Sequence, residues 1–247
     1  MSARNILLGK GTKLHVSKLS ACDRIFPPIV QLTAQAADLG DETITVAIAP
    51  ALDIAIIATE DNPVYLDFVE PNGKQHLVIV TDTIDPGATT LTVRALPRDM
   101  SANAVGSYPP VLSRRTDINL STNDTDTEAS TFDEEEWMDG AVTKLGQAIS
   151  APGHYTIAAG WETCLDCRLN LLEAYAIVVL PKKECDNLYP HGHVFHGAVT
   201  VGSMPVESPN AGIIQGSIDL TFRGRVRVIK PWEAFPPVVT PAPVPVP

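Results

Sequence analysis

Residues 40–50 read GDETITVAIAP, and the same pattern returns in degenerate form at residues 87–97 as GATTLTVRALP. In each copy a Gly precedes a run in which Thr alternates with Ile, Leu or Val, and a Pro closes the run. Alternation at period two is typical of a β-strand, Gly permits the tight turn before it, and Pro cannot donate a ladder hydrogen bond. The pattern predicts a duplicated β-unit without catalytic residue types.

The duplication lies within a segment, residues 34–112, that carries further strand patterns. Residues 64–69 and 76–80 alternate apolar with polar side chains and flank the sequence EPNG at residues 70–73. Such a Pro-Asn-Gly cluster between two alternating runs predicts a β-hairpin. The Pro-Pro pair at residues 109–110 marks the exit, so we expect this segment to be an inserted small β-module.

The flanking segments, residues 1–33 and 113–235, predict the main body, with an N-terminal arm and a long closing strand over residues 213–228. Residues 162–176 place Leu and Ala at helical spacing with charged residues opposite, which predicts one helix. Residues 236–247 repeat Pro, Val and Ala and predict an extended polyproline tail. We therefore expect a mainly β fold, a β-sandwich or open barrel with one flanking helix plus the inserted module.

Charge is unevenly distributed along the chain. The formal net charge is −11, which disfavours a protein that grips nucleic acid but suits one that nucleic acid slides past. Residues 1–24 are basic, whereas residues 124–139 carry only acidic charges. Two interpretations stay open, namely two solvated faces, or head-to-tail contact between the segments of neighbouring subunits. Residues 116–132 predict a loop, and residues 134–150 permit a short helix or a strand.

Composition and cysteine content set the class of protein. The chain has 247 residues, of which 45% are apolar, so it can bury a substantial core. Four Cys in a chain of this length fit a reducing compartment without a disulfide framework. The N-terminal apolar stretch is too short for a secretory signal, so we expect synthesis in the cytosol and no membrane association.

One set of residues could bind a metal. Thiols and imidazoles at short intervals are what tetrahedral zinc needs, and the set comprises Cys164, Cys167, Cys185, His191, His193 and His196. Against a metal, the first two Cys lie on the predicted helix and could equally be small core residues. No nucleophile elbow, phosphate loop or dinucleotide-binding glycine pattern occurs. We therefore expect neither an enzyme nor a cofactor.

The order of segments resembles that of bacteriophage major tail proteins, the subunits of the tail tube. The resemblance rests on the Gly-led repeat, the acidic Thr- and Ser-rich segment, and above all residues 196–228, HGAVTVGSMPVESPNAGIIQGSIDLTFRGRVRV. In many tube proteins a strand of small and β-branched residues leads through Ser and Pro into a long closing strand. The resemblance spans most of the chain.

The resemblance implies a structural protein that forms hexameric rings, which stack into a hollow tube for DNA delivery. Its partners would be further copies of itself, the tape measure, tail terminator and baseplate or tail-tip proteins, with or without a sheath. It would be assembled in the host cytoplasm and located in the virion tail. The terminal arm and the acidic segment are then expected to make subunit contacts, through Lys10, Lys13, Asp124, Asp126, Glu128, Glu134, Glu135 and Glu136.

Two other interpretations remain. The insert at residues 34–112 is long for a minimal tube subunit, and it is expected either to decorate the outside or to thicken the wall. A chain with such an insert could instead be a capsid decoration protein or a receptor- or carbohydrate-binding tail module. A zinc-stabilised protein is the third interpretation, and metal analysis would test it.

Overall fold

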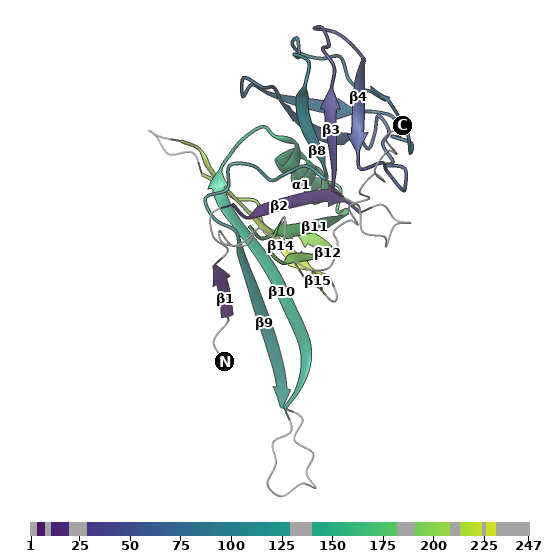
Figure 1. Ribbon diagram of the computed structural model, residues 1–247. Helices are drawn as coiled ribbons and strands as arrows, with labels where there is room; N and C mark the ends of the chain where they lie inside the picture. Colours follow the sequence, from purple (N-terminus) through teal and green to yellow (C-terminus); the bar gives the residue numbers. More distant parts are fainter. Residues whose placement is uncertain are drawn as a thin grey trace, which may run out of the picture.

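The computed structural model describes residues 4–7, 11–19, 29–128, 140–181, 191–207, 213–223 and 226–230. Strands account for 49% of the chain, and a single helix lies among these residues. The strands form two sheets, one of six strands and one of nine that curls into a half-barrel (Figure 1). The mainly β fold with one helix is thereby confirmed.

The smaller sheet forms a unit that we call the ring module. Its strands are β3 (Val30–Ala34), β4 (Thr43–Ala49), β5 (Val64–Val69), β6 (Gln75–Val80), β7 (Thr90–Thr92) and β8 (Ala104–Tyr108). They pair in the order β6-β5-β8-β3-β4-β7, and an isolated bridge between Val80 and Val93 joins the two ends. The ring encloses its own apolar core. The predicted hairpin is confirmed as β5 and β6, which pair antiparallel.

The lower boundary predicted for the insert is wrong by one strand. The sequence predicts residues 30–33 as part of the main body, because the insert is expected to begin at residue 34. Instead β3 pairs with both β4 and β8, so it belongs to the ring module. Long-range pairing of this kind leaves no local sequence signal.

The two sequence copies are related by an internal two-fold. Strands β4 and β7, one from each copy, pair antiparallel with each other. The Val46 N–H donates to the Thr89 carbonyl, and the repeat-equivalent Val93 N–H donates to the Glu42 carbonyl. When β3, β4 and β5 are exchanged with β6, β7 and β8, respectively, the same pairs of strands are neighbours around the ring. The duplication has therefore produced a ring of two similar halves.

This symmetry predicts matched effects at Gly40 and Gly87. Both glycines have positive φ, 89° and 83°, and a Cβ added at either would meet nothing within 4 Å. Replacing either with Ala should therefore cost only backbone strain, about 1–2 kcal/mol, and nearly the same at both sites. Urea unfolding of Gly40→Ala and Gly87→Ala measures this. The exposed neighbour Thr89→Ala should change little, and markedly unequal costs at the two glycines would contradict the equivalence.

The larger sheet, which we call the main sheet, comes from the rest of the chain. Its strands are β1 (Arg4–Leu7), β2 (Lys13–Lys18), β9 (Asn119–Glu128), β10 (Gly140–His154), β11 (Glu173–Val179), β12 (Val194–Val201), β13 (Val206–Glu207), β14 (Gln215–Phe222) and β15 (Arg227–Ile229). The main path runs β1-β9-β10-β14-β12-β11-β2, with β13 beside β14 and β15 beside β12. Helix α1 (Ala159–Leu169) packs on one face and closes the second apolar core.

The predicted helix over residues 162–176 is wrong at both ends and in its buried face. Helix α1 begins at Ala159 and ends at Leu169, and residues 173–176 belong to β11. Its buried positions are small residues and one Trp, whereas Leu169 is 71% exposed. The close approach of the helix to the sheet favours small side chains, so counting Leu residues selected the wrong face.

Two further expectations changed. Residues 119–128 are the strand β9 and not a loop, and residues 140–150 are strand within β10. The closing strand over residues 213–228 is shorter than expected, because β14 ends at Phe222 and β15 begins at Arg227. Among the described residues, no helix combines the length and apolar character needed to cross a bilayer.

Candidate functional site

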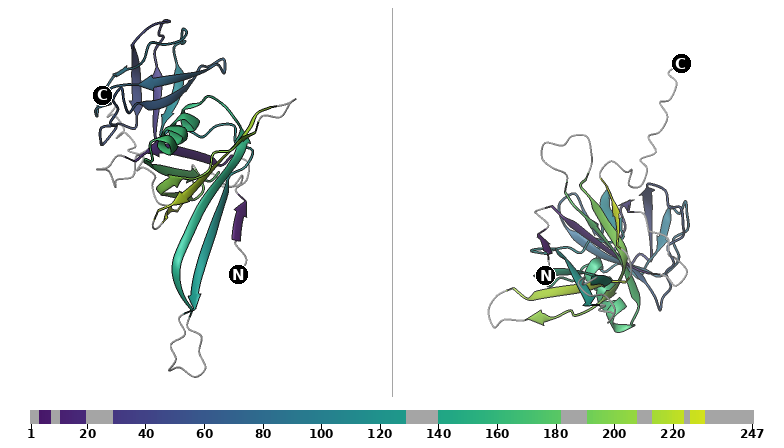
Figure 2. Two further views of the ribbon diagram at one scale, coloured as in Figure 1. Left: turned by 180° about the vertical axis from the view of Figure 1, so that it is seen from behind. Right: turned by 90° about the horizontal axis from the view of Figure 1, so that it is seen from below.

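The most distinctive surface feature is a two-stranded extension of the main sheet. Strand β1 pairs with β9 only at residues 119–122, and β14 pairs with β10 only from Ala148 onward. Beyond these positions β9 and β10 pair only with each other in the part of the chain that the structure describes, and they project well away from the body (Figures 1 and 2). We call residues 123–128 and 140–147 the ribbon. Both of its edges present unpaired backbone groups among the described residues, and isolated two-stranded sheets are marginally stable in water.

The structure places the predicted contact residues in different locations. Asp124, Asp126 and Glu128 occupy alternate positions of β9 within the ribbon. Lys13 begins β2, which is the opposite edge strand of the main sheet, and it is exposed. Within one subunit Lys13 is therefore not brought together with the acidic positions. Lys10, Glu134, Glu135 and Glu136 lie outside the described residues, as does the polyproline tail.

The main sheet has one apolar and one polar face near the base of the ribbon. On β14, Ile218 and Leu220 are buried in the core, and the alternate residues Ser217 and Asp219 face the other way. The Asp219 carboxylate accepts hydrogen bonds from the hydroxyls of Ser150 (2.8 Å) and Ser203 (2.5 Å). This face thus presents small hydroxyl groups around a fixed negative charge.

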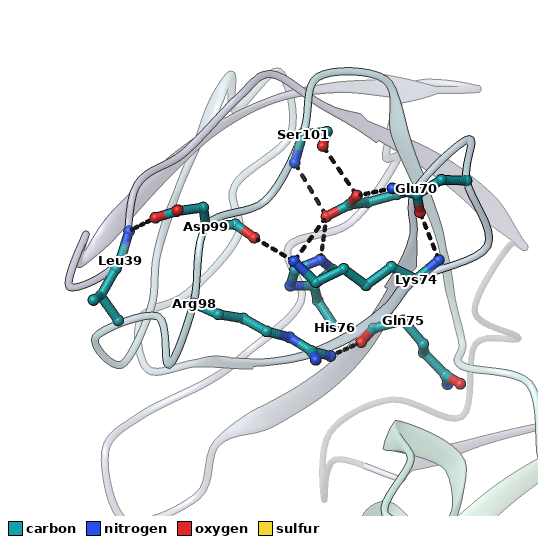
Figure 3. A network of polar contacts seen from close by, with 9 residues as sticks. Leu39, Glu70, Lys74, Gln75, His76, Arg98, Asp99 and Ser101 are labelled. Atoms are coloured by element: carbon teal, nitrogen blue, oxygen red, sulfur yellow. Dashed lines mark hydrogen bonds and ion pairs between the residues drawn. The ribbon is translucent and has the colours of Figure 1, made fainter.

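A buried polar cluster lies in the ring module, at the turn of the β5–β6 hairpin (Figure 3). Glu70 is 3% exposed, and its Oε1 lies 2.5 Å from His76 Nε2. Ser101 donates to the same carboxylate through its backbone N–H (3.2 Å) and its hydroxyl (3.0 Å), and Asn72 donates through its amide (2.8 Å). Burial alone would raise the pKa of Glu70, but these hydrogen bonds outweigh it and lower the pKa to about 2.

The geometry of this cluster does not suit nucleophilic catalysis. In a Ser-His-acid triad the imidazole stands between the hydroxyl and the carboxylate so that it can take the hydroxyl proton. Here the Glu70 carboxylate stands between Ser101 and His76, and both direct their donors at it. Ser101 is therefore not activated by His76, and the cluster closes the hairpin turn onto the chain around residue 101.

A second polar site joins the ring module to the main sheet. The Asp67 carboxylate, on β5, accepts a hydrogen bond (2.9 Å) from the backbone N–H of Ala159, the first residue of α1. An anion at a helix N-terminus is favoured by the helix dipole. Lys18, on β2, donates to Asn62 and to the Pro63 carbonyl (both 2.7 Å) and also pairs with Asp166 of α1. These contacts fix the module against the body.

Asp67 carries a testable pH dependence. Burial raises the pKa of Asp67 from 3.8 to about 6, against the opposing hydrogen bond from Ala159. Because the pKa of Asp67 is higher in the folded state than in the unfolded state, ionisation of its carboxylate destabilises the fold. This loss of folding free energy is absent below about pH 3.8, grows as the pH rises, and is complete above about pH 6. Asp67→Asn should therefore be more stable than the wild type at pH 7.5, by up to about 3 kcal/mol.

Urea unfolding of both proteins between pH 4 and pH 7.5 measures this difference, which should shrink as the pH falls. Asp53→Asn, at an exposed position of the same module, is the matched control for the loss of one carboxylate. An Asp67→Asn protein that is less stable than wild type at pH 7.5 would mean that the charged bond to the helix outweighs burial.

The thiols proposed as metal ligands have a different environment. Cys164 and Cys167 are fully buried on α1 and belong to the core beneath the main sheet. Burial raises the pKa of the Cys167 thiol to about 12 and that of the Cys164 thiol still further, which disfavours the thiolate that zinc requires. Among the described residues, no group of three or more potential ligands could hold a metal ion. Cys185 lies outside them.

Sequence reasoning missed two residues that organise the structure, Asp67 and Arg115. The Arg115 guanidinium donates to the carbonyls of Ala151 (3.2 Å), Gly216 (2.9 Å) and His154, so it ties β10 to β14. Neither residue lies in a recognisable motif, and only the three-dimensional contacts identify them.

Comparison of the chain with protein-family models and with curated proteins finds no match.

Proposed function

We propose that this chain is the subunit of a bacteriophage tail tube, in which hexameric rings stack into a conduit for DNA. The ribbon is the observation that carries the proposal. A long sheet that continues into two strands with open edges leaves backbone donors and acceptors free to pair with a neighbour. Closure of such pairing around a ring satisfies the edges without a further protein.

The polar face of the main sheet supports a role as channel lining. Hydroxyl groups around Asp219 offer no positive charge to phosphates, and Arg223, directly after β14, is ion-paired with Glu173. A net charge of −11 acts in the same direction. DNA would therefore pass such a wall without tight binding.

The ring module supports a role on the outside of the assembly. It has its own closed core, and it joins the body through α1 beside β5, through Lys18 and Asp67, and through backbone hydrogen bonds between β2 and residues 110–112. A module of this kind could be carried on the outer wall of a tube. The same observation favours the second candidate, a virion surface component that recognises a ligand through this module.

Electron microscopy of the purified protein separates these functions. A tube subunit should give rings, or tubes of uniform width, as the protein concentration is raised. A protein that stays monomeric at all concentrations would overturn the tube proposal and leave the surface-component candidate. The tape measure, tail terminator and tip proteins are then the partners to test for binding at the ends of the tubes.

A further inference from the structure

The C-terminal end of α1 and the loop after it expose three leucines, which we call the leucine turn. Leu169 is 71% exposed, Leu171 is 91% exposed and Leu172 is 36% exposed. Side chains of this size bury readily, and a cluster of them on the surface marks an interaction site more often than an isolated exposed residue does. The turn joins the C-terminal end of α1 to β11.

The backbone at Leu171 is a second, independent observation. Its φ is 54°, the left-handed region that favours glycine. The Leu172 N–H donates to the Cys167 carbonyl (2.8 Å), which is the hydrogen bond of a Schellman motif with Leu171 at the position where glycine is usual. A leucine is thus held in a strained conformation with its side chain in solvent. Strain of this kind points to a role outside the isolated subunit.

A separate apolar surface lies at the other end of α1, and we call it the isoleucine patch. Its exposed members are Ile157 (67%), Val206 (50%), Ile213 (65%) and Ile214 (40%). The Tyr155 N–H donates to the Ile214 carbonyl, and Val206 pairs with Gly216, so these segments lie together. Ile157 precedes the helix, whereas the leucine turn follows it, so α1, about 16 Å long, separates the two surfaces.

We infer that the leucine turn of one subunit docks onto the isoleucine patch of the next copy of this chain. A head-to-tail contact joins two different surfaces of one subunit, as these are, and its repetition gives a ring when the rotation between subunits closes. Exposed Arg168 adjoins the leucine turn and exposed Glu207 adjoins Val206, which offers one pair of opposite charges across the contact. Glu173, on the other side of the leucine turn, is ion-paired with Arg223 of its own subunit. The inference rests on the proposed function in that the partner is a second copy.

The variant Leu171→Gly tests this contact, because it removes the side chain and relieves the strain together. The melting temperature of the dilute protein should stay the same or rise. The concentration at which rings or tubes form should rise at least about tenfold, the equivalent of one buried leucine. Leu39→Gly, at a position in the ring module that is 65% exposed, is the matched control and should assemble as the wild type does.

Photocrosslinking locates the contact directly. With p-benzoylphenylalanine at position 171, intersubunit crosslinks should map to residues 157, 206, 213 or 214. Normal assembly of Leu171→Gly, or crosslinks to other surfaces, would overturn the inference while leaving the tube proposal intact. If the wild type forms only small oligomers that Leu171→Gly abolishes, the contact stands and the tube proposal fails. A wild type without any self-association overturns both.

Discussion

Deletion of residues 124–145 is expected to abolish the assembly of rings and tubes while the rest of the subunit stays folded. The deletion joins Asn123 to Gly146, which lie opposite each other in the register of β9 and β10. Asn-Gly is a favoured two-residue turn between antiparallel strands, and Thr122 and Gln147 already face each other on either side of it. The shortened hairpin therefore keeps every pairing of β9 and β10 with the remainder of the sheet.

The deletion protein is expected to lose assembly because the deletion removes the backbone of the ribbon. Among the described residues the two ribbon strands pair only with each other, so the deletion removes no pairing with the rest of the main sheet. The melting temperature and far-ultraviolet circular dichroism should change little. Assembly should fail because the neighbouring subunit loses the strand edges with which it pairs. Electron microscopy and sedimentation velocity at matched concentrations measure the outcome.

A variant without the acidic side chains separates the ribbon backbone from its acidic residues. Asp124→Asn, Asp126→Asn and Glu128→Gln keep the ribbon and remove its three negative charges. Assembly of this variant would assign the contact to the backbone, whereas its failure would assign part of the contact to the acidic residues. Normal tubes from the deletion protein would contradict a role for the ribbon in assembly.

The sequence predicted the strands that have a core on one side. Strands β4 and β7 and the β5–β6 hairpin each bury alternate residues, and that burial produces the period of two by which they are recognised. For the same reason the sequence shows which residues of each repeat copy face the core. It does not show the pairing of the two copies with each other, because contacts between distant segments leave no mark on either one.

The strand β9 shows why the ribbon was missed. Residues 119–128, NLSTNDTDTE, have no apolar alternation beyond Leu120 and read as a loop. Leu120 belongs to the core, but the positions after it carry only polar residues, so the period of two by which a half-buried strand is recognised is missing from the sequence. The leucine turn led to the wrong buried face for the predicted helix, because leucines at helical spacing were expected to be buried and instead face solvent.

Replacing Trp161 with Ala is expected to cost about 3–5 kcal/mol of folding free energy, the largest loss for a single side chain that we predict. Trp161 is 2% exposed and lies between α1 and the main sheet. Its ring packs edge-on against Tyr155, with ring centroids 5.1 Å apart, and the Arg115 guanidinium lies 5.4 Å from the ring. A Cβ at Gly216 would lie 2.8 Å from the indole, so the ring rests directly on β14.

The loss should exceed that from simple burial because the neighbours cannot close the cavity. Arg115 is held by backbone carbonyls of both β10 and β14, and Gly216 has no side chain that could fill the space. Trp161→Phe keeps an apolar ring and should recover more than half of the stability. Urea unfolding followed by circular dichroism measures both variants. A loss below about 1 kcal/mol for Trp161→Ala would mean that α1 shifts to fill the gap, and that the helix is not fixed on the sheet by this residue.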